Sequence, residues 1–248
     1  MTNPDKKTAI NEHGQPIGFA VAEWQSPQSP SGETLVGQYC RLEKLDWATH
    51  GAALAKANQH DKAGKNWTYL AYGPFQSDAE YQQWVVSSSK STDPFFYAIV
   101  SQESGQAVGV ASFMRDTPAA GSIEVGHIHF SPLLQRTPLA TEAMYLLASH
   151  VFGLGYRRYE WKCDSLNAPS RAAAKRLGFS YEGVFRQALV YKGRNRDTAW
   201  FAMIDSDWPV LAAAFERWLS PGNFDESGQQ RERLSDLTSA ALATTRVA

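Results

Sequence analysis

The side chains best suited to acid–base chemistry in this sequence fall within one short stretch. Glu124, His127 and His129 can each accept a proton, and they lie in a segment, residues 124–130, whose polar and apolar residues alternate as in a β-strand. Because side chains in a strand alternate between two faces, the two histidines should share one face and Glu124 should point to the other unless a bulge intervenes. The carboxylate and the histidines are therefore rival proton acceptors.

Two histidines separated by one residue can also bind a metal ion. A zinc site in a protein usually needs at least three protein ligands, and no third candidate lies near His127 and His129 in the sequence. Packing on the sheet or hydrogen bonding in a pocket explains the pair better. The sequence therefore predicts no metal site.

A turn and the start of a helix follow the strand, and together they could bind an anion. Residues 135–137 form the turn, Thr137 suits the N-cap, and Pro138 falls in the first turn of the helix, where proline is tolerated. The first N–H groups of a helix have no intrahelical partner, and the helix dipole favours negative charge there. Arg136 adds a cation. An ordinary strand-to-helix junction would look the same, so these residues alone leave both interpretations open.

Hydrophobic periodicity and capping residues indicate the elements that position these side chains. The segments expected to be strands are 35–42, 95–100, 107–114, 124–130, 157–163, 179–191 and 196–205. The segments expected to be helices are 47–59, 77–87, 138–152, 168–177 and 207–219. This order predicts an α/β fold around one mixed sheet.

Composition narrows the class of protein. The 248 residues are 43% hydrophobic and 20% charged with a net charge of −1, so bulk charge gives no reason to expect nucleic acid or a membrane as partner. No apolar run is long enough to span a membrane. Cys40 and Cys163 match no metal spacing and fit buried thiols in a reducing compartment. We therefore expect a cytoplasmic protein.

Two motifs resemble the GNAT acetyltransferases, and most closely their RimJ/RimL-like branch. Residues 135–143, QRTPLATEA, are similar to the family's pyrophosphate loop, Q/R-x-x-G-x-G/A, where it runs on into a TEA helix. Residues 167–183 are similar to the pattern N-x-x-S…LGF-x-x-EG of the same branch. Two motifs in the family's order are more specific than either alone, and the resemblance covers about residues 35–206.

The resemblance implies the GNAT acyl-CoA N-acyltransferase fold. This is an α/β (α+β mixed) arrangement with one central, mostly antiparallel sheet, which is splayed at the cofactor and flanked by helices. The chain would then consist of an N-terminal arm (1–33), the acetyltransferase domain (34–219) and a polar C-terminal tail (220–248). The tail is expected to be either poorly ordered or a helix that docks late.

The implied cosubstrate is acetyl-CoA, with no metal. By resemblance, the loop would hold the pyrophosphate, the strand backbone at 128–130 would pair with the pantetheine arm, and Asn167 would bind the pantetheine amides. The cofactor residues expected on this basis are Ile128, His129, Phe130, Gln135, Arg136, Thr137, Leu139, Ala140, Thr141, Asn167 and Ser170. Pro138 replaces the family's first loop glycine, and since proline has no N–H, one candidate phosphate donor is lost.

Acetyl transfer to an amine needs a base for the amine and a hydrogen-bond donor for the departing thiolate. By resemblance, the expected catalytic residues are Glu124 as base, His127 as its alternative, and Ser170 as the donor. Without the resemblance, Glu124 would be a solvated strand charge, while Asn167 would only cap a helix and Ser170 would be a solvated first-turn residue. Cys163 lies in an apolar strand pattern and is a poor nucleophile, so direct transfer is expected.

Two further segments could border the acceptor. The aromatic segment 66–75 is either loop packing or a wall of the acceptor pocket. The basic turn 192–197 is either a solvated hairpin or a contact for the acceptor or the 3′-phosphate of CoA.

The predicted function is an N-acetyltransferase that moves an acetyl group from acetyl-CoA to an amine, either a protein N-terminus or a small molecule. The alternative, motivated by Pro138, is a catalytically weak or inactive CoA-binding or regulatory module on the same scaffold. An exposed edge strand or the tryptophan-bearing C-terminal helix could support a homodimer.

Overall fold

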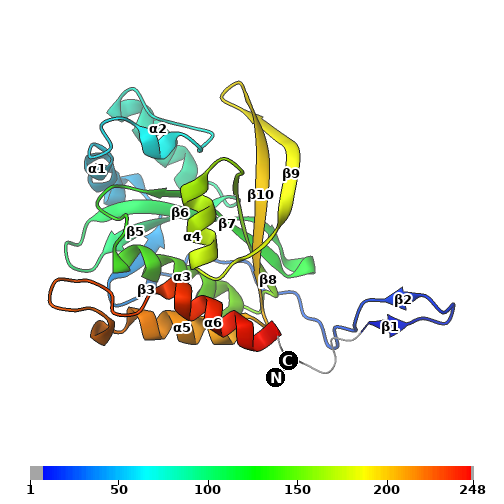
Figure 1. Cartoon of the computed structure of the whole chain (residues 1–248). Helices are drawn as coiled ribbons and strands as arrows, with labels where there is room; N and C mark the ends of the chain where they lie inside the picture. Colours follow the sequence, from blue (N-terminus) through cyan, green and yellow to red (C-terminus); the bar gives the residue numbers. More distant parts are fainter. Residues whose placement is uncertain (1–7, 247–248) are drawn as a thin grey trace.

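A computed structural model describes residues 8–246, and its centre is one eight-stranded sheet (Figure 1). The outermost residues of the expected arm and tail, 1–7 and 247–248, lie outside the described range. The strands are β1 (Ala9–Ile10), β2 (Pro16–Ile17), β3 (Leu35–Val36), β4 (Cys40–Lys44), β5 (Phe95–Ser101), β6 (Ala107–Thr117), β7 (Ser122–Phe130), β8 (Arg158–Asp164), β9 (Ser180–Tyr191) and β10 (Arg194–Ile204). The helices are α1 (Trp47–Asn58), η1 (Lys65–Trp67), α2 (Asp78–Ser89), η2 (Pro118–Ala120), α3 (Pro138–Gly153), α4 (Ala168–Arg176), α5 (Trp208–Leu219), η3 (Pro221–Asn223) and α6 (Leu234–Arg246).

The large sheet has the strand order β3-β4-β5-β6-β7-β8-β10-β9. Every neighbouring pair is antiparallel except β7 and β8, which are parallel because α3 carries the chain back between them. This confirms the expected mixed α/β fold with a mostly antiparallel sheet. Within the described range, no helix is long and apolar enough to cross a membrane.

Helix starts follow the local sequence signals. The N-caps of four helices accept a hydrogen bond from the backbone N–H three residues on, which satisfies one of the first-turn donors. These caps are Asp46 for α1, Ser77 for α2, Thr137 for α3 and Asn167 for α4. Pro138 also occupies the first turn of α3, as expected.

The expected single strand at 35–42 is wrong. The chain forms two short antiparallel strands instead, with Leu35 opposite Leu42 and Val36 opposite Arg41, and it reverses direction at residues 37–39. The reversal is held by Glu142 of α3, whose buried carboxylate accepts hydrogen bonds from the backbone amides of Gln38, Tyr39 and Cys40 at 2.7, 2.6 and 2.7 Å. A carboxylate about 100 residues away in the chain therefore decides where this strand breaks.

The two faces of the sheet carry separate cores. On one face, α3 and α5 cover a large apolar cluster that includes Tyr97, Phe113 and Phe201. On the opposite face, α1, α2 and the aromatic segment cover a second cluster, centred on Trp67 and Tyr81. Here α1 packs on β6 and α2 on β5, and none of the described helices lies over the same face of β8, β10 and β9 (Figure 1).

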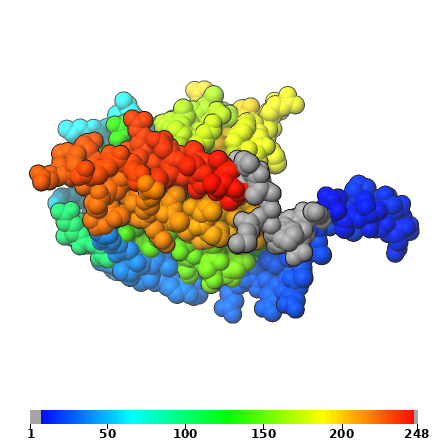
Figure 2. Space-filling view, turned by 60° about the horizontal axis from the view of Figure 1, so that its bottom comes forward, coloured from blue at the N-terminus to red at the C-terminus, as the bar shows by residue number. Residues whose placement is uncertain are grey.

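The described parts of the arm and the tail differ: the tail contributes to the larger core, whereas the β1–β2 hairpin contributes to neither core. In the tail, α6 packs on α5 and α4, with Leu234 and Thr238 buried. The second half of the tail is therefore a docked helix, one of the two alternatives expected for it. At the other end, β1 and β2 form a hairpin that stands away from the body (Figures 1 and 2).

Candidate active site

The central feature of the site is a divergence between β7 and β8. The two strands pair from Ser122–Arg158 to Val125–Trp161, and past this point the described structure has no further pair between them. Residues 126–130 of β7 stay bound to β6 alone. The edge of β7 that faces β8 therefore offers backbone groups without a strand partner past Val125 to a ligand that enters the gap.

A β-bulge lies where the strands diverge. Val110 of β6 pairs with His129 and Ser112 pairs with Gly126, so two residues of β7 lie opposite one residue of β6. His127 occupies the bulge with a φ of 50°, which is unusual for a residue with a side chain. The extra residue shifts the alternation of side chains by one position, so residues after the bulge point to the face opposite the one that strict alternation would give. The expectation that Glu124 and the histidines occupy opposite faces is therefore wrong: they share the face that carries α1 and α2.

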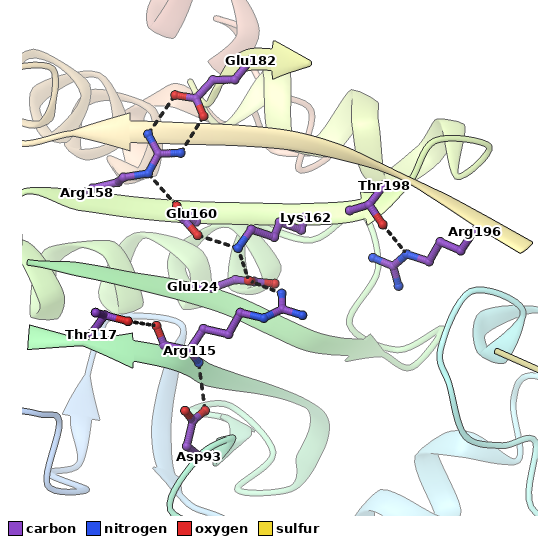
Figure 3. Close-up of polar contacts among 10 residues, drawn as sticks. All are labelled: Asp93, Arg115, Thr117, Glu124, Arg158, Glu160, Lys162, Glu182, Arg196 and Thr198. Atoms are coloured by element: carbon purple, nitrogen blue, oxygen red, sulfur yellow. Dashed lines mark hydrogen bonds and ion pairs between the residues drawn. The ribbon is translucent and has the colours of Figure 1, made fainter. Parts of the chain in front are cut away.

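Glu124 belongs to a buried chain of ion pairs across the sheet (Figure 3). Its Oε2 lies 2.7 Å from an Arg115 nitrogen and 2.9 Å from Nζ of Lys162. Lys162 also contacts Glu160 at 2.6 Å, and Arg158 joins Glu160 to Glu182. Glu124, Lys162 and Glu160 are themselves largely buried, and buried charges need such partners.

This pairing leaves one oxygen of Glu124 available. Both cations bind Oε2, and Oε1 has no polar partner among the described residues. Oε1 lies 3.7 Å from the position a Cβ on Gly126 would take, beside the point where the strands diverge. A carboxylate in this place can accept a proton directly or through water.

His127 is held against an aromatic wall. Its Nδ1 lies 3.1 Å from the hydroxyl of Tyr72, and the two rings stack. Burial lowers the pKa of His127 to about 4, and the charge of Arg115 contributes. His127 is therefore neutral at physiological pH and a weaker proton acceptor than an ordinary histidine.

His129 is more deeply buried. Its ring stacks on Trp67 at 3.7 Å, and its Nε2 is buried without a hydrogen-bond partner. Burial lowers the pKa of His129 to about 4, with a small opposing effect from Asp61. The aromatic segment thus contacts both histidines, and it both packs on the sheet and lines the face that carries Glu124.

The buried neutral state of His129 should make stability depend on pH. Because its pKa lies below the ordinary value of about 6.5, the unfolded state binds a proton more readily, and stability is complete above pH 6.5 and lost as pH falls toward 4. The loss from His129 should reach about 3 kcal/mol. In urea titrations from pH 7.5 to 4.5, His129→Phe should flatten this dependence, whereas replacing the exposed His60 by Gln should not. Equal slopes for all three proteins would contradict this account.

The turn before α3 has the geometry of an anion site with few donors. Arg136 adopts a φ of 61°, which turns the chain sharply into the helix. The hydroxyl of Thr137 donates to the carbonyl of Leu134 at 2.7 Å and accepts from the amide of Ala140 at 3.2 Å. The amide of Ala140 is therefore engaged by the cap. Pro138 has no N–H, which leaves the amides of Arg136, Thr137 and Leu139 as the nearest candidate donors.

Gln135 connects this turn to the aromatic segment. Its side-chain nitrogen donates to the carbonyl of Phe130 at 2.8 Å and to the side chain of Asn66 at 3.0 Å. Asn66 also donates to the carbonyl of Phe130, at 3.3 Å. Gln135 and the Phe130 carbonyl, both expected to contact the cofactor, thus bind each other here, which fixes the end of β7 relative to the turn.

Ser170 lies beside the same divergence. Its Oγ accepts a hydrogen bond of 3.0 Å from the indole N–H of Trp161, the last residue of β8 that pairs with β7. This contact does not use the hydroxyl proton of Ser170, although the thiol of Cys163 also lies within hydrogen-bond reach of the hydroxyl. Asn167 caps α4 through its side-chain oxygen, bonded to the amide of Ser170. Burial raises the pKa of Cys163, which disfavours its reactive thiolate.

The β9–β10 hairpin closes one side of the site. Nζ of Lys192, in the basic turn, donates to the carbonyl of Trp67 at 2.8 Å, and the hydroxyl of Tyr191 donates to Asp164. The turn is therefore tied to the aromatic segment across the open face of the sheet.

Sequence reasoning missed three residues of the site, Arg115, Lys162 and Trp161, whereas Tyr72 lies in the aromatic segment that it considered. The alternation of residues 157–163 could have placed Lys162 on one face of its strand and Trp161 on the other. Nothing in the sequence indicated that Lys162 would meet Glu124, because that contact depends on the parallel pairing of β7 with β8.

The fold and the site together define the class of protein. A family model for the acetyltransferase (GNAT) domain matches residues 40–180, and the chain belongs to this family. It is similar to the crystal structure of a GCN5-related N-acetyltransferase from Brucella melitensis, with 45% sequence identity and a TM-score of 0.86 over 88% of this chain and 100% of that one.

A second solved structure adds information about one branch of the family. The apo form of RimL, a ribosomal L7/L12 alpha-N-protein acetyltransferase, is 25% identical, with a TM-score of 0.59 over 71% of this chain and 97% of that one. None of the curated proteins is similar enough to match this sequence.

Proposed function

We propose that this chain is an N-acetyltransferase that transfers an acetyl group from acetyl-CoA to a primary amine by direct attack. The observation that carries the proposal is the gap between β7 and β8, which begins where Val125 pairs with Trp161. A pantetheine arm in this gap would meet the free backbone edge of β7, and the turn at Arg136 would receive the pyrophosphate.

The two faces of the sheet divide the chemistry between them. Glu124 lies on the face that carries the aromatic segment, whereas Trp161, which binds Ser170, belongs to the core on the other face. An amine that approaches from the aromatic side would lose its proton to Oε1 of Glu124. Acetyl-CoA supplies the activated acetyl group. When the C–S bond breaks, the hydroxyl of Ser170 donates a hydrogen bond to the departing thiolate.

The acceptor is proposed to be the α-amine of a protein N-terminus, in the manner of the RimJ/RimL-like branch. This rests on the two sequence motifs and on the likeness to the RimL structure. Two buried free thiols fit a reducing compartment, and we place the protein in the cytoplasm.

The test of the proposed function has two stages. Titration of acetyl-CoA should raise the melting temperature and so show binding. A screen of N-terminal peptides and small amines should then show that at least one class gains about 42 Da, the mass of one acetyl group replacing hydrogen. Binding without transfer or hydrolysis would favour the CoA-binding module that Pro138 suggests. The absence of binding would refute both functions.

Replacement of Ser170 by alanine should slow transfer with little effect on cofactor binding. Loss of one hydrogen bond to the developing thiolate should lower kcat by about 10- to 100-fold, while the Kd for acetyl-CoA should change by less than about twofold. Steady-state kinetics and calorimetry measure the two quantities separately.

The control for this variant is Trp161→Phe, which keeps an aromatic but smaller side chain and removes the indole N–H that orients Ser170. It should reduce kcat by a smaller factor. An unchanged kcat in Ser170→Ala would remove this residue from the mechanism.

A further inference from the structure

The N-terminal arm carries apolar side chains that the rest of the chain does not cover. Ile10, Ile17 and Val21 are 64%, 46% and 42% exposed. The β1–β2 hairpin has two residues in each strand and stands away from the body in both views (Figures 1 and 2). An isolated two-stranded hairpin of this size is marginally stable in water, so it needs another surface.

The base of the arm is fixed on its own subunit. The indole N–H of Trp24 donates to the carbonyl of Ala119 at 3.2 Å, and the Arg157 guanidinium lies over the rings of Phe19 and Trp24. The segment before Phe19 therefore leaves the body from a defined point and in a defined direction, as a projecting element does.

At the edge of the large sheet, β9 offers a surface of the complementary kind. It is the last strand in the sheet order, and it pairs only with β10 among the described strands, so alternate residues between 181 and 191 direct N–H and C=O groups to an outer edge that no described strand covers. Val190, Phe185 and Leu189 are 81%, 57% and 43% exposed. A long, apolar, uncovered edge is a docking site for another strand.

The charges of the two surfaces are opposite. Residues 8–24 of the arm carry the acidic Glu12 and Glu23 and no Lys or Arg. Residues 180–197 carry four basic side chains and two acidic ones. The four basic residues are Arg186, Lys192, Arg194 and Arg196. Attraction between the acidic arm and the basic hairpin favours their encounter over contact between two arms or two β9 strands.

We propose that this chain forms a twofold dimer in which the N-terminal hairpin of each copy adds to the outer edge of β9 of the other. One arm alone would bury a small area, but twofold symmetry uses the contact twice and brings the pair toward the area of a stable interface. The exchange covers apolar side chains on both surfaces and part of the sheet edge. It also places the partner's arm against the hairpin that closes the active site. The dimer does not depend on the proposed activity.

Single charge substitutions on each surface test the exchange. Light scattering at known concentrations should give the wild-type protein twice the mass of one chain. Ile17→Glu on the arm and Val190→Glu on β9 should each raise the dimer dissociation constant by about tenfold or more. Arg186→Glu should weaken it less, and its effect should shrink at high salt. Val36→Glu, a control at a valine that is 65% exposed on β3, should leave the mass unchanged.

Mixing two defective proteins separates arm exchange from other dimers. In a mixture of Ile17→Glu and Val190→Glu, one copy has an intact arm and the other an intact β9, so one of the two contacts can form. The mixture should therefore associate more tightly than either variant alone.

Four results would overturn the proposal. A monomeric wild-type protein would do so, including one whose arm folds onto its own β9. So would a dimer that resists Ile17→Glu, a dimer that resists Val190→Glu, or a mixture no tighter than its parts. Because all the altered positions are exposed, circular dichroism should show intact folding, and Arg186→Glu provides a second β9 variant if Val190→Glu misfolds.

Discussion

Replacing Glu142 by alanine should lower the free energy of unfolding by about 3–4 kcal/mol, one of the largest losses available from a single substitution in this chain. The side chain is 4% exposed, and its two oxygens accept three backbone N–H groups from residues 38–40. Alanine would leave the buried amide of Cys40 without a partner and remove the acceptor of the more accessible amides of Gln38 and Tyr39. The measurement is urea unfolding followed by tryptophan fluorescence.

Two variants sharpen this result. Glu142→Gln keeps one acceptor oxygen but turns an NH2 group toward backbone donors. Its free energy of unfolding should therefore lie between those of the wild type and Glu142→Ala. Glu216→Ala, which removes an exposed carboxylate bound to Tyr145, should cost less than about 1 kcal/mol. If Glu142→Ala unfolds at the same urea concentration as wild type, the carboxylate does not hold the β3–β4 reversal.

The largest loss of activity should follow from Glu124→Gln. An amide cannot take the proton of the attacking amine, so kcat should fall by about 100- to 1,000-fold, with acetyl-CoA affinity nearly unchanged. His127→Gln should have a smaller effect, because the pKa of about 4 makes this histidine a weak base at physiological pH. Steady-state rates with a saturating amine give the comparison.

Glu124 also has a structural role, which needs its own control. Lys162→Met removes the buried cation that binds Oε2 but leaves Oε1 and the contact with Arg115. If the rate depends on Glu124 as a base, Lys162→Met should lower the free energy of unfolding but reduce kcat by less than about tenfold. Equal rate losses in both variants, or a fully active Glu124→Gln, would assign the proton transfer elsewhere.

Local signals in the sequence were sufficient for much of the fold. The strand, turn and helix from 124 to 153 appear as predicted, because alternation, a Thr cap and a first-turn proline are all properties of adjacent residues. The divergence of the sheet was expected only from the family resemblance. Nothing in the order of polar and apolar residues indicates where β7 stops pairing with β8.

The errors share one physical cause. A bulge adds a single residue, so periodicity alone could not show that His127 would shift the strand and bring Glu124 to the same face as the histidines. The break at 37–39 depends on Glu142, and the partner of Glu124 is Lys162 from another strand. Each of these features comes from residues distant in sequence, which a local pattern does not record.

The short parallel pairing of β7 with β8 has a consequence for local stability. Four residue pairs form the backbone pairing between the half of the sheet that holds β3–β7 and the half that holds β8–β10. Side chains join the halves on both faces, through Lys162 with Glu124 and Lys192 with Trp67 on one face and the continuous apolar core on the other. The two halves of the sheet share only a short stretch of backbone pairing, and a ligand in the gap would add contacts between them. Because the backbone pairing between the halves is short, a bound ligand should protect the amides of β7 and β8 beside the gap from hydrogen exchange more than those in the rest of the sheet.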